Sequence, residues 1–184
     1  MWVLGGVALL ILLWGFANYN ALVRGRNHCK EAWSNVDAEL KRRYNLIPNL
    51  VETVKGYAAH ERETLENVVR ARAQALGDAG SVAQQANSEN ALVGSIKSLL
   101  AVAEAYPDLK ASQHFLKLQK ELANTEDRIQ AARRFYNANV RDLNTRIQSF
   151  PSLLLANAFK FTEAEYFRVE GLALEQTSQV QVSP

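Results

Sequence analysis

Cysteine, proline and glycine are scarce in this sequence of 184 residues, which has one, four and nine of them. The single cysteine, Cys29, excludes a disulfide framework and any zinc site built from several cysteines. The low proline and glycine content excludes a collagen-like or linker-rich chain. The sequence also lacks an excess of one charge. Its 21 Lys and Arg residues face 19 Asp and Glu residues, and a net charge of +2 predicts no nucleic-acid partner.

The four prolines stand at positions 48, 107, 151 and 184, and the stretches between them hold few helix breakers. Residues 108–150 contain neither proline nor glycine, and as a helix they would extend about 65 Å. A β protein of this size needs more turn residues at shorter spacing. We therefore expect an all-α fold made of a few long helices.

Signatures of catalysis are also missing from the sequence. It has no HExxH motif, no Glu-x-x-His pair, no phosphate-binding glycine loop and no G-x-S-x-G elbow. The three histidines, His28, His60 and His114, are scattered along the chain and are interpreted as residues on helix surfaces. We therefore predict a protein that is not an enzyme and that has no cofactor or metal site.

The N-terminus, by contrast, is rich in apolar residues. No charged side chain precedes Arg24, and an uncharged helix of this length spans about 34 Å, against roughly 30 Å of membrane hydrocarbon. Aromatic rings stand near both ends of the run, as in a membrane-interface belt. We predict a transmembrane anchor at residues 1–23, marked by Trp2, Leu10, Trp14, Phe16 and Tyr19.

Two other interpretations of the apolar run stay open. A cleaved signal peptide usually has a positive N-terminal region and a small-x-small cleavage site, and this sequence offers neither clearly. A helix in the core of a soluble protein is the other interpretation. An uncleaved anchor fits the length and the flanking residues best.

Basic residues follow the anchor directly, at Arg24, Arg26 and Lys30. By the positive-inside rule they predict a short N-terminus outside and a cytoplasmic remainder, on a single-pass membrane protein. The same residues are placed to meet anionic lipid headgroups. A salt-bridged helix surface, in which Glu39 pairs with Arg43 one turn later, is an equally open and compatible interpretation.

The rest of the sequence divides into helices at its prolines and glycines. We expect the anchor helix to continue to about residue 44 and to break at 45–47, because Pro48 disfavours helical geometry before it. Ser88 is a candidate cap for a third helix, and Thr162 and Glu165 have the spacing of a capping box before a last turn. Further helices are expected at about 48–76, 89–105, 108–150 and 152–159. They predict an antiparallel bundle at residues 24–170, followed by a loose tail at 171–184.

Apolar residues recur at helical spacing along the predicted bundle. In the segment 108–150 they return every seven residues, which is a heptad stripe, and a similar stripe at 48–76 includes the charged Glu61 and Arg72. Such stripes fill either the core of one bundle or an interface with a neighbouring copy, and the sequence leaves both open. The residues predicted for this core or interface are Trp33, Leu40, Ile47, Phe115, Leu122, Ile129, Tyr136, Leu143 and Phe150.

Two segments of the sequence carry a specific resemblance. The first is Leu40-Lys41-Arg42-Arg43-Tyr44-Asn45-Leu46-Ile47-Pro48-Asn49-Leu50-Val51, and the second is Arg133-Arg134-x-Tyr136-Asn137. With Phe150-Pro151-Ser152 and shorter matches over about residues 18–168, this ordered series resembles the LemA family of bacterial membrane proteins. The family-motif residues are Arg42, Arg43, Tyr44, Pro48, Asn49, Arg133, Arg134, Tyr136, Asn137 and Pro151.

The resemblance implies one N-terminal membrane helix, a cytoplasmic bundle of long antiparallel helices and no established enzyme activity. Some relatives are associated with intracellular membrane compartments in magnetic bacteria, which implies a role in shaping membranes. We therefore expect a non-enzymatic scaffold of the bacterial inner membrane that self-assembles. The alternative is an adaptor or signalling partner that docks another envelope or stress-response protein. The expected partners are membrane lipid, further copies of this chain and another membrane protein.

Overall fold

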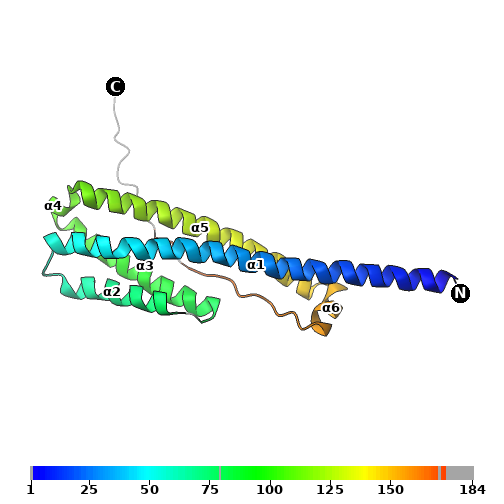
Figure 1. Ribbon diagram of the computed structural model, residues 1–184. Helices are drawn as coiled ribbons and strands as arrows, with labels where there is room; N and C mark the ends of the chain where they lie inside the picture. Colours follow the sequence, from blue (N-terminus) through cyan, green and yellow to red (C-terminus); the bar gives the residue numbers. More distant parts are fainter. Residues whose placement is uncertain (1, 79, 170, 173–184) are drawn as a thin grey trace, which may run out of the picture.

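Helices make up most of the chain in the computed structural model, which describes residues 2–78, 80–169 and 171–172. These residues form six helices and no strand, so the predicted all-α fold is confirmed. Figure 1 shows that the longest helix, α1, projects well beyond the others at its N-terminal end. Apart from Gly171 and Leu172, the predicted loose tail lies outside the described residues.

Helix α1 covers Trp2–Tyr57 without interruption, and its 56 residues measure about 84 Å at 1.5 Å per residue. The predicted break at residues 45–47 is therefore wrong, although Pro48 lies inside the helix. A proline lacks the N–H that would bond the carbonyl of residue i−4, which here is Tyr44. The Nε of Arg72 donates to that carbonyl at 2.7 Å. Because a neighbouring helix supplies the missing bond, the proline does not end α1.

Five shorter helices follow and pack on α1 or on one another. They are α2 (Arg62–Gly77), α3 (Val82–Glu104), α4 (Pro107–Lys110), α5 (Gln113–Gln148) and α6 (Ser152–Ala158). Helix α5 lies along α1, while α2 packs against both α3 and α1. The long helices alternate in direction, so the predicted antiparallel bundle is confirmed (Figure 1).

Three predicted helix starts are corrected by local structure. The helix expected at 108–150 is interrupted after α4, and α5 starts only at Gln113, where the Ser112 side chain caps it. The segment expected as one helix at 48–76 is divided by a turn at 58–61, where the chain reverses from α1 into α2. Helix α3 starts at Val82 rather than after Ser88, because Ser81 and Gln84 form a reciprocal capping box. The serine predicted as a cap is therefore buried in the interior of a helix.

The core runs through the whole bundle, and α1 and α5 each contribute many of its buried residues. Among the predicted core or interface residues, Trp33 is half-buried and its ring centroid lies 5.2 Å from that of Tyr136. Phe150 departs from the prediction, since it is 79 % exposed and follows the end of α5 at Gln148. The remaining seven are at most 4 % exposed, and they are Leu40, Ile47, Phe115, Leu122, Ile129, Tyr136 and Leu143. This burial favours the core of one chain over an interface.

A non-helical segment, residues 161–169, returns from α6 along the bundle and is here called the strap (Figure 1). The predicted helical turn after a Thr162–Glu165 capping box is therefore wrong. The carboxylate of Glu165 instead accepts a hydrogen bond from the backbone N–H of Ala83 at 3.1 Å, in the first turn of α3. The strap also contributes to the core, because the Phe167 side chain is fully buried.

Candidate functional site

Among the described residues, α1 is the one helix that is long and apolar enough to cross a membrane, and its apolar part is N-terminal. Its apolar window has a mean hydropathy of 1.7, and none of that window is buried in the bundle. Leu10 is 68 % exposed, for example, and Phe16 is 71 % exposed. A core helix of a soluble protein would be covered by its neighbours, so this exposure opposes that interpretation.

An aromatic cluster marks the place where the anchor meets the bundle. The Tyr19 ring lies 4.8 Å from the Phe159 ring and 5.9 Å from the Phe161 ring, measured between centroids. The guanidinium of Arg26 stacks over Phe161 at 5.2 Å, a cation–π contact. Tyr19, the last of the five residues that mark the predicted anchor, therefore packs against the segment that follows α6.

The three predicted juxtamembrane basic residues, Arg24, Arg26 and Lys30, are all exposed on α1. Arg24 lines a shallow groove of about 250 Å³ with Arg146 of α5, so cations of two helices gather next to the anchor. Asp142 lines the same groove. Exposed cations at this level are suited to anionic lipid headgroups.

A buried ion cluster lies deep in the bundle. The Arg43 guanidinium on α1 is fully buried, and it donates from Nη1 to the carboxylate of Glu126 on α5 at 3.0 Å. Its Nη2 donates to the carboxylate of Glu89 on α3. The predicted pairing of Arg43 with Glu39 is therefore wrong. Glu39 instead faces Arg42, with 3.6 Å between its Oε2 and the arginine Nε.

Polar neighbours complete the hydrogen bonding of both carboxylates. The Tyr44 hydroxyl and the Gln85 amide donate to Glu89, and the Gln130 amide donates to Glu126 at 2.7 Å. Burial, followed by the charge of Glu89, raises the pKa of Tyr44 well above its usual range, so this hydroxyl stays a donor. One cation thus holds two carboxylates from two other helices, and the cluster joins α1, α3 and α5.

Sequence reasoning missed this cluster, although a signal was present. Glu89 precedes Leu92 by three residues and Ile96 by seven, so it lies in the apolar stripe of α3. Glu126 precedes Ile129 by three residues in the stripe of α5. A lone carboxylate inside each of two stripes indicates a buried partner cation, because an unpaired buried charge is strongly unfavourable.

The second family motif holds the strap. Asn137 uses its whole amide, since Nδ2 donates to the Phe167 carbonyl at 3.0 Å and Oδ1 accepts from the Phe167 N–H at 2.9 Å. Asn144 binds the backbone of Ala164 in the same two-bond manner, at 2.9 Å in both directions. The Tyr136 hydroxyl donates to the carbonyl of Glu165 at 2.8 Å.

The spacing of the two asparagines matches that of the strap. Asn137 and Asn144 are seven residues apart, which is about 10.5 Å along a helix. Ala164 and Phe167 are three residues apart, which is about 10 Å along an extended chain. The side chains of α5 therefore form hydrogen bonds with the backbone of the strap, as the backbone of a neighbouring strand would in a sheet. Arg133 adds a further bond, from its guanidinium to the carbonyl of Val169.

The other family-motif residues lie on the surface. Arg42, Pro48, Asn49, Arg134 and Pro151 are all exposed. The described residues include no group of three or more His, Cys, Asp or Glu that would hold a metal ion. The buried charges are almost completely shielded from solvent, because the side chains of Arg43 and Glu89 are 0 % exposed and that of Glu126 is 4 % exposed. The arrangement is therefore suited to joining helices rather than to binding a substrate.

The sequence profile of the LemA family matches residues 32–183, a range that contains the ion cluster, the strap and both motif segments. The chain belongs to the LemA family. Protein LemA of Metamycoplasma hominis is 29 % identical over 160 residues, which is 82 % of this chain and 72 % of that protein. The family resemblance expected from the motifs is thus confirmed.

Two further relatives carry names that refer to the magnetosome. Magnetosome protein MamQ of Magnetospirillum gryphiswaldense is 25 % identical over 174 residues, covering 81 % of this chain and 64 % of the relative. Magnetosome protein MamQ 1 of Paramagnetospirillum magneticum is 28 % identical over 191 residues, covering 90 % and 70 %. None of these LemA-family names denotes an enzyme. Together with the exposed apolar helix, they indicate a membrane-associated protein.

Proposed function

We propose that this LemA-family chain is a non-enzymatic, membrane-anchored scaffold that self-assembles and organises the membrane around it. The observation that carries the proposal is the continuity of α1, which joins the apolar segment to the bundle without a hinge. From Arg24 to Tyr57 the same helix extends about 50 Å beyond the anchor. An assembly of such rods would transmit its geometry directly to the membrane.

The outer face of α2 is the proposed contact between copies. Val69 and Leu76 are seven residues apart on this helix and are 51 % and 47 % exposed. Val69 also lines a groove of about 810 Å³ between α2 and the end of α1. The rim of the groove has both Glu66 and Arg70, so a second copy can meet opposite charges there. A heptad-spaced apolar pair is the pattern by which helices associate side by side.

The proposed location is the bacterial inner membrane, with a short N-terminus outside and the bundle in the cytoplasm. The exposed cations Arg24, Arg26 and Lys30 on the bundle side of the anchor support this orientation by the positive-inside rule. Its test is Leu116→Cys in a Cys29→Ser background, since Leu116 is exposed on α5. An impermeant thiol reagent should label this cysteine only after the cells are opened, and labelling of intact cells would reverse the orientation.

Disulfide crosslinking in membranes tests the self-assembly. In the Cys29→Ser background, Val69→Cys should give a crosslinked dimer, because a two-fold axis that passes through the proposed contact brings the two copies of Val69 close together. Leu116→Cys is the matched control, since Leu116 is 42 % exposed but lies on α5. Crosslinking at both positions would indicate random collision. A lack of Val69→Cys dimers, together with a monomeric mass in nanodiscs, would contradict the proposal.

The same experiment separates the scaffold from the adaptor alternative. If Val69→Cys forms adducts only with a different membrane protein, the outer face of α2 docks a partner and the chain is an adaptor. We favour the scaffold because the groove rim carries charges of both signs, which suits a second copy of the same surface.

A further inference from the structure

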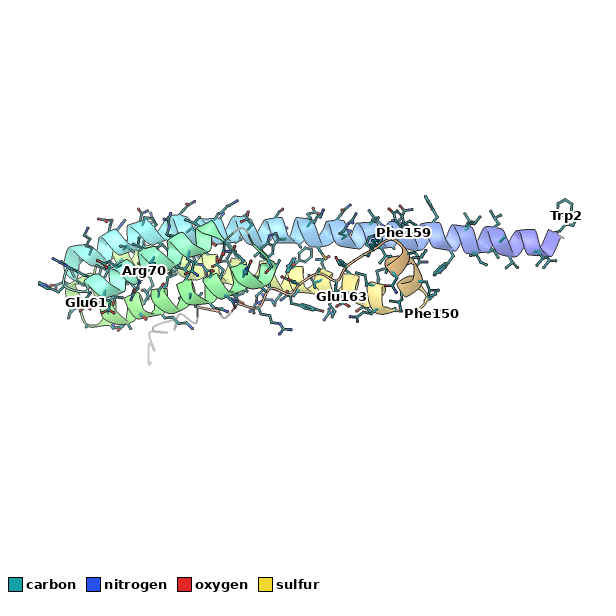
Figure 2. The ribbon with its side chains drawn as sticks, turned by 90° about the horizontal axis from the view of Figure 1, so that it is seen from below. Trp2, Glu61, Arg70, Phe150, Phe159 and Glu163 are labelled. Atoms are coloured by element: carbon teal, nitrogen blue, oxygen red, sulfur yellow. The ribbon has the colours of Figure 1, made fainter. Side chains whose placement is uncertain are left out.

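Helix α6 packs against α5 and also against the apolar segment of α1. Leu155 and Phe159 face Trp14, Phe16 and Tyr19 of α1 across a groove of about 420 Å³. Figure 2 shows Phe150 and Phe159 at the end of the folded bundle that is nearest to Trp2. This end of the molecule is where the predicted anchor enters the membrane.

The segment that contains α6 has apolar side chains that are largely uncovered. Phe150 is 79 % exposed, Leu154 is 60 % exposed and Phe159 is 58 % exposed. The segment 150–159 contains no charged residue, and Lys160 and Arg146 flank it. Exposed aromatic and leucine side chains between cations are typical of a segment that lies in a membrane interface.

The depth of α6 follows from its contacts with α1. If the hydrocarbon core starts at Trp2, its roughly 30 Å end at about residue 22. Trp14 and Tyr19, which line the groove with α6, would then lie about 12 Å and 5 Å inside the cytoplasmic boundary. Amphipathic helices at membrane surfaces bury their apolar face by about 5–10 Å, a range that overlaps these depths.

We propose that α6 is a second membrane contact, which lies in the cytoplasmic leaflet and holds a lipid acyl chain in the groove between α6 and α1. The inference rests on the proposed anchor but not on self-assembly. Lipid is the occupant because α6 is fixed to α1 at the level of the anchor, where acyl chains surround the protein on all sides. A folded domain that enters one leaflet displaces lipid in that leaflet alone, and this would link the scaffold to membrane curvature.

The test is depth-dependent quenching on the full-length chain in vesicles of phosphatidylethanolamine and phosphatidylglycerol. A fluorophore is attached at Phe159→Cys or Leu154→Cys in the Cys29→Ser background, with circular dichroism to check folding. Both positions should be quenched several-fold by lipids with a nitroxide near the headgroup end of the acyl chain. The matched control is Phe135→Cys on α5, since Phe135 is 58 % exposed, the same as Phe159. This control should not be quenched.

A third position, Leu10→Cys, reports on the anchor alone, because Leu10 is 68 % exposed and does not line the groove between α6 and α1. Leu10 lies near the middle of the apolar segment and should be quenched best by a nitroxide near the methyl end of the acyl chain. Quenching at 10 without quenching at 154 and 159 would overturn the inference and leave the anchor intact. Absence of quenching at all three positions would overturn both. Shielding of 154 and 159 from water without lipid quenching would show that protein covers α6, which also overturns the inference.

Discussion

Arg43 on α1 and Glu126 on α5 form a buried ion pair of 3.0 Å, although 83 positions separate them in the sequence. The same guanidinium binds Glu89 on α3, so one cation serves carboxylates from two other helices. Both carboxylates depend on Arg43 for their countercharge. The cluster is therefore a point at which the register of three helices is fixed relative to one another.

Replacing Arg43 tests the importance of this cluster. Arg43→Met leaves two carboxylates without a cation in the core, and we expect a loss of about 3–5 kcal/mol in the free energy of unfolding. Urea unfolding of the full-length chain in mild detergent measures this loss. The control is the adjacent Arg42→Met, whose side chain is 52 % exposed and which should change stability by no more than about 0.5 kcal/mol. Equal effects of the two substitutions would show that the buried ion cluster does not stabilise the bundle.

The stripe on α5 is tested by placing a charge in it. Ile129 is fully buried, so Ile129→Asp should lower stability by several kcal/mol and unfold the bundle. Phe135 on the same helix is 58 % exposed, and Phe135→Asp should leave the thermal melting curve nearly unchanged. An unchanged melting curve for Ile129→Asp would show that the stripe is an exposed interface rather than the core.

The continuity of α1 at Pro48 depends on Arg72. Arg72→Met leaves the Tyr44 carbonyl without a donor and should lower stability by about 1–3 kcal/mol. In a Pro48→Ala background the new backbone N–H can donate to Tyr44, so the same Arg72→Met change should have a much smaller effect. A double-mutant cycle of unfolding free energies measures this coupling. Additive effects of the two substitutions would mean that Arg72 does not replace the bond lost at the proline.

Local patterns predicted the helices well but not the contacts that override them. The heptad stripe of α5 and the apolar segment of α1 were readable because each repeats one signal over many residues. The expected break before Pro48 was wrong because Arg72, 24 residues further along the chain, satisfies the freed carbonyl. No pattern within a few residues of the proline contains that information.

In the candidate site, too, local patterns identified residues but not the distant contacts that they make. The family motifs pointed to Arg43 and Asn137, but their roles depend on partners far away in the sequence. Arg43 binds residues 46 and 83 positions away, and Asn137 binds the strap 30 positions away. The strap was mistaken for a helical turn because Thr162 and Glu165 have capping-box spacing, and only tertiary contacts keep it extended.

The attachment of the strap to α5 is tested at Asn137. Asn137→Ala removes both hydrogen bonds to the Phe167 backbone and should lower stability by about 1–3 kcal/mol. Amide hydrogen exchange at Phe167 should become faster, because its N–H loses its acceptor. The control is Asn139→Ala on the same helix, whose amide bonds only the Phe135 carbonyl one turn away. This variant should leave hydrogen exchange in the strap unchanged. Equal acceleration in both variants would show that the Asn137 hydrogen bonds do not hold the strap.

Tyr136 predicts how stability responds to alkaline pH. Burial raises the pKa of Tyr136 to about 12, with smaller contributions from Cys29 and Glu165. In the unfolded chain a tyrosine ionises near pH 10. The folded state holds this proton more tightly, so its contribution is complete below about pH 10 and is lost between about pH 10 and 12. Over that window the loss is about 2–3 kcal/mol.

Tyr136→Phe separates this contribution from other alkaline effects. At neutral pH the variant should be less stable by about 1 kcal/mol, because it lacks the hydrogen bond to the Glu165 carbonyl. It has no phenol to ionise at position 136, so its stability should fall less steeply above pH 10, and the two curves should cross before about pH 12. Tyr57→Phe, which removes an exposed hydroxyl at the end of α1, controls for the chemical change. Parallel curves for wild type and Tyr136→Phe from pH 8 to about 12 would show that burial of this hydroxyl does not control alkaline unfolding.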